Sequence, residues 1–121
     1  MIKNNYGEKM YDADYKYAIF QRDNFKCQFE GCTVCGCDNL ELAHRISKGK
    51  IGQKYVKRYL LEKYTIDLSM REVFIFFINH KFNMVASCKK HNDYFNVLYN
   101  PEEANKIIDE IIKSNKRLRG E

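Results

Sequence analysis

Two pairs of metal-binding residue types, far apart in the chain, constrain its fold more than any other feature. Cys27 and Cys32 are spaced C-x4-C, and Cys88 and His91 are spaced C-x2-H. Tetrahedral zinc sites are usually assembled from two such pairs, because each pair turns the backbone so that both ligands face one ion. The sequence therefore predicts a structural zinc ion that ties the early part of the domain to the late part.

The cysteine-rich segment leaves the choice of ligands open. Cys32 and Cys35 form a C-x2-C, and Cys37 follows closely, so Cys35 in place of Cys32 is the alternative. We prefer Cys27 with Cys32 because Gly31 allows a tight turn between them. In a different interpretation, the cysteines are small buried hydrophobic residues. A thiol redox protein using Cys32 and Cys35 is disfavoured, because no βαβ pattern surrounds them.

The bulk properties predict one cytoplasmic domain spanning residues 1–121. The chain has 121 residues, starts at Met1 without a secretory leader and contains five cysteines. An odd number of cysteines without a leader argues against a disulfide framework. No apolar run approaches the roughly 20 residues that a membrane span needs, so we expect no membrane contact. A domain of this size has a modest core, which a metal ion would support.

Positive charge is concentrated in one stretch of the chain. The formal net charge is +5, and seven basic residues but a single acid lie between His44 and Lys63. Such a patch fits contact with phosphate groups, although an ordinary solvated helix face is the alternative. The predicted nucleic-acid contacts are Arg45, Lys48, Lys50, Lys54, Lys57 and Arg58.

The apolar patterns predict a mixture of helices and short strands. Asp12 or Asp14 can begin a helix that ends near Asp23, and 70–78 fits either a buried helix or a strand. Strands are expected at 40–44 and 84–86, and helices at 53–64, 90–99 and about 101–115. The last helix is the clearest, with Asn100 as its cap, Pro101 in its first turn and an apolar stripe that packs.

Three segments together resemble the HNH endonucleases. Residues 22–28 (RDNFKCQ) are similar to the opening of that family, 40–44 (LELAH) to its first motif and 83–92 (NMVASCKKHN) to its second. The resemblance covers about residues 22–96. It implies an α+β fold with a small zinc-stabilised ββα-metal core, flanked here by additional helices such as the packing helix at 101–115.

The resemblance also implies a catalytic site. His44 matches the general base, Asn83 the middle asparagine, and Asn92 the third position, which would bind Mg²⁺ or Mn²⁺. A neutral imidazole can deprotonate water near pH 7, and either a backbone carbonyl or the Asn83 amide can hold its other nitrogen. An amide oxygen suits Mg²⁺, which stabilises the transition state. His91 falls on the second position of the metal pair and is assigned to zinc.

One position departs from the family pattern. Many members carry Asp or His immediately before the base, as a metal ligand, where this chain has Ala43. His80, Asp93 or water can compensate. In an alternative register, His44 is the ligand and Arg45 lies at the base position.

The implied function is metal-dependent hydrolysis of phosphodiester bonds in DNA. A homodimer would allow cleavage of both strands, and restriction, mobile-element and phage roles all fit the motif. The alternative is a zinc-stabilised DNA-binding module without catalysis.

Overall fold

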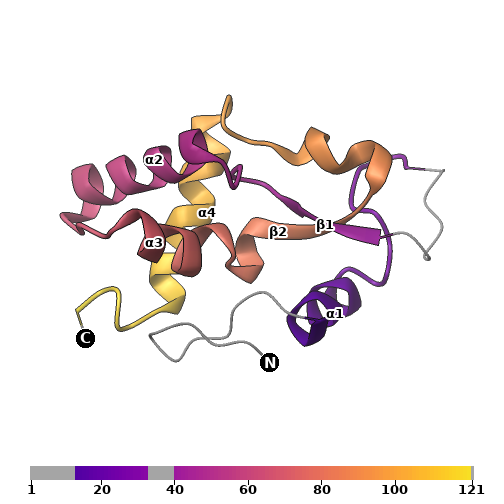
Figure 1. Cartoon of the computed structure of the whole chain (residues 1–121), viewed down its shortest axis with the longest axis horizontal. Helices are drawn as coiled ribbons and strands as arrows, with labels where there is room; N and C mark the ends of the chain where they lie inside the picture. Colours follow the sequence, from indigo (N-terminus) through magenta and orange to yellow (C-terminus); the bar gives the residue numbers. More distant parts are fainter. Residues whose placement is uncertain (1–12, 33–39, 121) are drawn as a thin grey trace. The chain divides into compact units, whose positions relative to one another are not determined.

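The computed structural model describes residues 13–32 and 40–120 (Figure 1). The chain combines helices with a small two-stranded antiparallel sheet, which confirms the predicted α+β class. It divides into two compact units, one formed by Met1–His44 and Met84–Phe95, the other by Arg45–Asn83 and Asn96–Glu121. None of the described helices has the length and apolarity needed to cross a membrane.

The first unit contains the sheet. Strand β1 (Leu40–His44) pairs with β2 (Met84–Cys88), so that Leu40 lies opposite Cys88 and His44 opposite Met84. Both predicted strands are therefore confirmed. Helix α1 (Ala13–Arg22) contributes Ile19 to a small core that also contains Leu42 and Met84.

The second unit is helical. Helix α2 (Lys50–Tyr59) continues into a π-helical turn, η2 (Leu60–Tyr64). Helix α3 (Met70–Val73) similarly continues into η3 (Phe74–Ile78), and a 3-10 turn, η4 (Lys81–Asn83), follows. These elements and α4 (Pro101–Ser114) enclose the larger core. Its buried residues are Ile46, Val56, Leu60, Val73, Phe77, Ile78, Val97, Ala104, Ile107, Ile108, Ile111 and Ile112.

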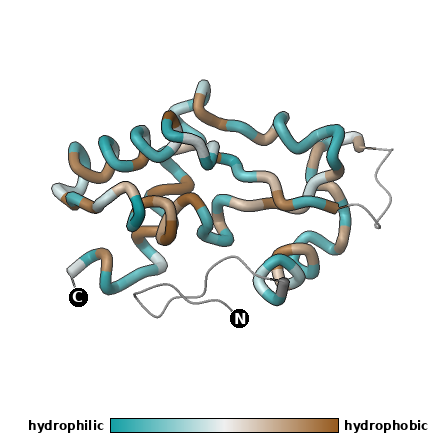
Figure 2. Tube along the Cα trace, in the orientation of Figure 1, coloured by the Kyte–Doolittle hydropathy of each residue, from teal (hydrophilic) through white to brown (hydrophobic). Residues whose placement is uncertain are grey.

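The ambiguous apolar run at 70–78 is helical. Its start is a capping box: Ser69 Oγ accepts the Glu72 N–H at 3.1 Å, and the Glu72 carboxylate accepts the Ser69 N–H at 3.0 Å. These reciprocal bonds satisfy two amides that the first turn would otherwise leave open. Figure 2 shows how hydrophobic this segment is, which explains why its periodicity did not decide between helix and strand.

The predicted C-terminal helix is confirmed, and so is its cap. The Asn100 side chain accepts the Glu103 N–H at the start of α4, and Pro101 occupies the first turn. The helix predicted at 90–99 is wrong in type and extent, because η5 (Lys89–Phe95) is a 3-10 helix. The helix does not continue past Phe95, because the next amides bond elsewhere. The Val97 N–H donates to the Arg45 carbonyl at 2.8 Å, and the Leu98 N–H donates to the Asn96 side chain at 3.0 Å.

Candidate functional site

Four predicted ligands meet in the first unit. The ligand atoms of Cys27, Cys32, Cys88 and His91 all lie within 4.8 Å of one another, and three of the four residues are buried. Cys27 and Cys32 come from the loop after α1, Cys88 ends β2, and His91 lies in η5. The paired strands β1 and β2 and the segments that flank them thus bring together residues from distant parts of the sequence. This cluster can hold a metal ion such as zinc.

The distances between the ligand atoms suit tetrahedral coordination. Cys32 Sγ lies 3.8 Å from Cys88 Sγ, and His91 Nδ1 lies 3.8 Å from Cys27 Sγ and 3.2 Å from Cys88 Sγ. Ligands bound at about 2.0–2.3 Å around one tetrahedral ion stand roughly 3.5–3.8 Å apart. Two of the three distances match this spacing, and the contact between Cys88 Sγ and His91 Nδ1 is shorter. A disulfide would bring two sulfurs to about 2.05 Å, which is much closer than the 3.8 Å between Cys32 Sγ and Cys88 Sγ.

The surroundings of Cys27 favour metal binding over a free thiolate. Burial raises the pKa of the Cys27 thiol to about 11, although backbone N–H groups of Cys88 and Phe29 donate to its sulfur and oppose this. The Phe29 ring also stacks on the His91 imidazole, with centroids 4.2 Å apart. A bound cation would compensate the buried thiolate charge, while the amide donors and the stacked ring hold the ligands in place.

Unusual backbone conformations shape the loop that carries the first ligand pair. Gly31 has φ +79, and a Cβ added there would meet nothing within 4 Å. Glycine is therefore needed for its left-handed conformation and not for space, which confirms the predicted turn before Cys32. Asn24 (φ 58) and Phe25 (φ 54) are also left-handed, and they reverse the chain between α1 and Cys27.

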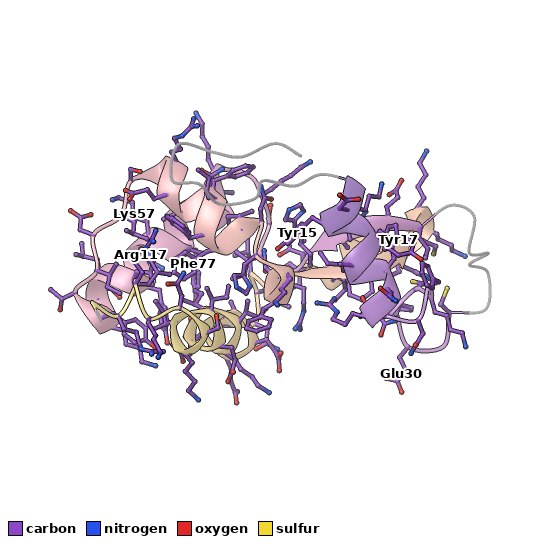
Figure 3. All side chains as sticks on the ribbon, turned by 90° about the horizontal axis from the view of Figure 1, so that it is seen from below. Tyr15, Tyr17, Glu30, Lys57, Phe77 and Arg117 are labelled. Carbon is purple, nitrogen blue, oxygen red and sulfur yellow. The ribbon has the colours of Figure 1, made fainter. Side chains whose placement is uncertain are left out.

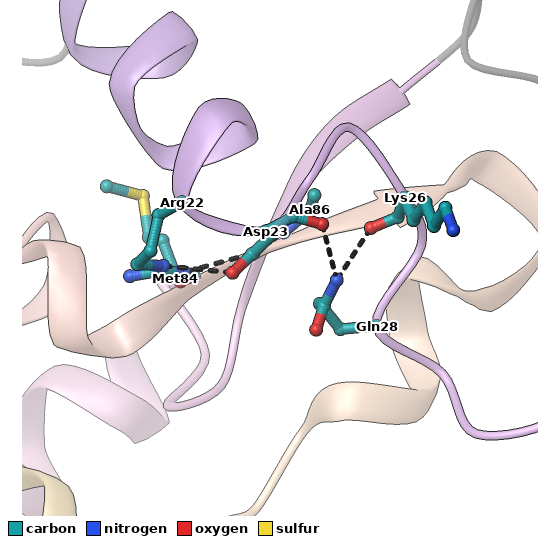
Figure 4. A network of polar contacts seen from close by, with 6 residues as sticks. All are labelled: Arg22, Asp23, Lys26, Gln28, Met84 and Ala86. Carbon is teal, nitrogen blue, oxygen red and sulfur yellow. Dashed lines mark hydrogen bonds and ion pairs between the residues drawn. The ribbon is translucent and has the colours of Figure 1, made fainter.

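A polar network joins this loop to the outer edge of β2 (Figure 4). Asp23 Oδ2 accepts the Ala86 N–H at 2.8 Å, and the Gln28 N–H donates to the Ala86 carbonyl at 3.0 Å. Arg22 bonds to the Asp23 carboxylate and donates to the Met84 carbonyl at 2.6 Å. These contacts fix Cys27 against the strand that leads to Cys88. The resemblance at residues 22–28 marked this segment but not its role, because its partners on β2 lie far away along the chain.

The alternative zinc ligand, Cys35, and its neighbour Cys37 lie outside the described residues. Within the described chain, Cys32 completes the cluster, as the preferred ligand set has it.

The predicted catalytic histidine ends β1 in the same unit. His44 is partly buried and lies opposite Met84, whereas Ala43 is fully buried and offers no ligand atom. Asn92 lies against the same strand from η5. Its amide nitrogen donates to Glu41 Oε1 at 3.1 Å and makes a longer contact to the Leu42 carbonyl at 3.5 Å. Glu41, which the sequence interpretation did not single out, therefore contacts a predicted cation ligand.

Asn83 belongs to the helical unit and is fully buried. Its Oδ1 accepts the Ile46 N–H at 2.7 Å, and its Nδ2 donates to the carbonyls of Ile46 (3.0 Å) and Ile78 (2.9 Å). Among the described contacts, its amide thus bonds to the main chain, whereas the sequence interpretation had offered it, beside a backbone carbonyl, as a partner for the His44 imidazole. It fixes the segment that follows β1 to the end of η3.

His80, one of two proposed substitutes for the missing ligand, is poorly suited to bind a cation. Its Nδ1 accepts the Phe82 N–H at 3.0 Å, so the neutral ring carries its proton on Nε2. Burial, with a contribution from Lys81, lowers the His80 pKa to about 4. The ring is therefore neutral at physiological pH, and neither nitrogen offers a lone pair to a metal. Asp93, the other candidate, is exposed.

No family model matches this chain, and no curated protein or solved structure is similar to it. The likeness to HNH nucleases therefore stays a prediction from the sequence motifs.

The predicted basic contacts fall into two groups within the helical unit. Arg45 bonds to Glu103 at 3.2 Å, and Lys57 (Figure 3) bonds to Asp67 at 2.9 Å and to the Leu68 carbonyl at 2.5 Å. The others are exposed: Lys48, Lys50, Lys54 and Arg58. The last three follow one another at four-residue spacing along α2 and so share a helix face. Within this second group, Arg58 also lies 4.0 Å from Glu62, so Lys48, Lys50 and Lys54 are the exposed basic residues with no ion pair among the described residues.

Proposed function

We propose that the chain is an HNH-type endonuclease that hydrolyses phosphodiester bonds in DNA. One observation carries the proposal. A possible metal site lies beside a two-stranded antiparallel sheet and a short helix, and its ligands are Cys27, Cys32, Cys88 and His91. That combination fits the ββα-metal core implied by the motifs. The bound ion would be zinc, because three thiolates and one imidazole are a common structural zinc set.

The proposed division of labour separates the fold from the chemistry. Zinc stabilises the hairpin, and His44 at the end of β1 accepts a proton from the attacking water. Asn92 contributes an oxygen ligand to Mg²⁺ or Mn²⁺, which stabilises charge on the phosphate when bound. Asn83 acts indirectly, because its amide fixes the segment after His44. Cleavage of both strands would require two such sites and hence a dimer.

DNA would be bound through the exposed basic face of α2. Lys50, Lys54 and Arg58 lie along that face, and Lys48 precedes it. Arg45 and Lys57 contribute less, because both are engaged in contacts within the protein, and Arg58 shares its charge with Glu62.

Replacing His44 with Ala tests the enzymatic role. We expect plasmid cleavage in Mg²⁺ or Mn²⁺ to fall by about 10²- to 10⁴-fold, the usual cost of losing a general base. Zinc content and DNA affinity should stay near those of the parent. His80→Gln is the matched control, since it removes a histidine outside the proposed site and should leave cleavage unchanged at neutral pH.

A second candidate function is a zinc-stabilised DNA-binding module without catalysis. Ala43 favours it, because a buried methyl group stands where a cation ligand is expected. A zinc-loaded parent protein that binds DNA but never cuts it, with either cation, would decide for this module. Unchanged cleavage by His44→Ala would contradict the assigned base.

A further inference from the structure

The four residues of the metal cluster differ in their access to solvent. Cys27 and Cys88 are 8% exposed and His91 is 7% exposed, so all three are buried. Cys32 is only partly buried, and it directly follows the exposed turn at Gly31. Reactive cysteines are typically those that solvent can reach, whereas buried cysteines are inert. A reagent dissolved in water is therefore expected to meet Cys32 before the other two thiols.

The sulfur of Cys88 is in a position to react with that of Cys32. The two Sγ atoms lie 3.8 Å apart. A disulfide holds its sulfurs at about 2.05 Å, so closing the bond takes a movement of about 1.8 Å, which the two side chains can share. Cys27 is a less suitable partner, because backbone N–H groups of Cys88 and Phe29 already hold its sulfur.

We propose that Cys32 is a site of reversible oxidation by hydrogen peroxide, with Cys88 as its resolving cysteine, and that the resulting disulfide expels zinc from the cluster. The proposal rests on zinc as the bound ion and not on nuclease activity. It gives the partly exposed ligand a role that a purely structural zinc site does not require.

The chemistry uses two thiolates and one peroxide molecule. Zinc holds its cysteine ligands as thiolates, which are the nucleophilic form. The Cys32 sulfur attacks the peroxide, so that the O–O bond breaks, an S–O bond forms and hydroxide leaves; the product is a sulfenic acid. The Cys88 thiolate then attacks that sulfur, forms the disulfide and displaces a second hydroxide. The two sulfurs together lose two electrons, and these electrons reduce the peroxide.

The loss of zinc acts on η5. The disulfide removes two of the four ligands together with their negative charges, and Cys27 and His91 alone do not complete a tetrahedral site. His91 is the buried residue of η5, so the ion ties η5 to the loop after α1. The same short helix carries Asn92, which bonds to Glu41 on β1. Zinc release should therefore loosen η5 and lower cleavage, and only this last consequence rests on the proposed function.

Peroxide treatment of the zinc-loaded full chain tests the proposal, with the released zinc measured by a chromogenic chelator. We expect one zinc to be released for each peroxide consumed, and mass spectrometry of the digested protein to find a disulfide between Cys32 and Cys88. Reduction with dithiothreitol should restore zinc binding. Zinc that stays bound, a disulfide between Cys32 and Cys35 instead, or a parent protein purified without zinc would each overturn the proposal.

A histidine at position 32 separates reactivity from metal binding. Cys32→His keeps a side chain that zinc accepts but removes the thiol. It should release zinc in peroxide at least about tenfold more slowly than the parent, because the reactive thiolate is gone. Cys35→Ser is the matched control: it removes a thiol three residues away in the sequence, and the release rate should not change. Release from Cys32→His at the parent rate, or protection by Cys35→Ser, would contradict the assignment.

A measurement on the parent protein decides the matter if Cys32→His fails to hold zinc. Dimedone traps sulfenic acids before they form a disulfide, and the labelled cysteine is identified by mass spectrometry. A label on Cys32 supports the proposal, and a label confined to other cysteines overturns it.

DNA cleavage by the same samples separates this proposal from the nuclease function. Peroxide-driven zinc release with a disulfide between Cys32 and Cys88, in a protein that never cuts DNA, would support the oxidation site and overturn the nuclease. Cleavage by a protein that keeps its zinc in peroxide would support the nuclease and overturn the oxidation site.

Discussion

Replacing Asn83 with Ala tests whether this buried asparagine serves the fold or the chemistry. Its side chain makes hydrogen bonds of 2.7, 3.0 and 2.9 Å to main-chain groups of Ile46 and Ile78. Asn83 and Ile78 are 0% exposed and Ile46 is 1% exposed, so water cannot take over these bonds without structural change. The substitution therefore leaves three buried main-chain groups without partners.

The expected loss of stability follows from those three groups. A buried group without its partner costs about 1–3 kcal/mol, and local relaxation recovers part of this. We expect Asn83→Ala to lower the free energy of unfolding by about 3–5 kcal/mol, a large share of the roughly 5–15 kcal/mol available to a domain. For a chain of this length, the melting temperature should fall by about 10–20 °C.

The assay is thermal and denaturant unfolding of zinc-loaded protein, with hydrogen exchange of the Ile46 amide as a local measure. That amide should exchange much faster in the variant, because its acceptor is gone. Asn92→Ala is the control: its amide is partly buried and bonds to a side chain, so it should cost less than about 1 kcal/mol. An Asn83→Ala protein of parent-like stability that has lost DNA cleavage would refute the structural role and restore Asn83 to the chemistry.

Two further predictions concern the helical unit. Replacing Lys48, Lys50 and Lys54 with Ala should weaken DNA binding and reduce the log–log salt slope by about one unit per lost phosphate contact, measured by fluorescence anisotropy at several salt concentrations. Lys57→Ala should leave that slope unchanged, because its amine is engaged with Asp67; an equal effect of Lys57 would contradict the assignment. The low pKa of His80, about 4 against an ordinary 6.5, means that the folded state favours the neutral ring, so its contribution to stability is complete above about pH 6.5 and is lost as the pH falls toward 4. Unfolding of His80→Gln across that range should show a shallower acid decline than the parent, and identical slopes would count against a buried neutral ring.

The elements that could be predicted from the amino-acid sequence are those whose signals lie within a few residues of one another. The cap, proline, acidic first turn and apolar stripe of α4 all act within one helix, so they could be recognised without knowing any partner. The alternation in 40–44 similarly predicted β1. The spacing within each ligand pair constrains the backbone over only a few residues. The pairs Cys27 with Cys32 and Cys88 with His91 could therefore be predicted as metal ligands.

Other features could not be predicted, because they depend on partners that are distant in the sequence. The run at 70–78 ends in six consecutive hydrophobic residues, so its periodicity could not distinguish a helix from a strand. The capping box of Ser69 and Glu72 is a local signal that our sequence interpretation did not use, whereas the packing of Val73, Phe77 and Ile78 in the larger core depends on distant partners. The helix expected at 90–99 ends at Phe95, because the Arg45 carbonyl takes the Val97 N–H.

The same distinction applies to the site. By residue type, Lys54 and Lys57 are equally good candidates for contacting phosphate. In the structure Lys57 forms an ion pair with Asp67, on the segment that follows η2, whereas Lys54 forms none with any described residue. Asn83 and Asn92 carry the same amide, yet one bonds to buried main chain and the other to Glu41. Side-chain chemistry states what a residue can do, whereas the packing around it determines which of its atoms remain available to a ligand.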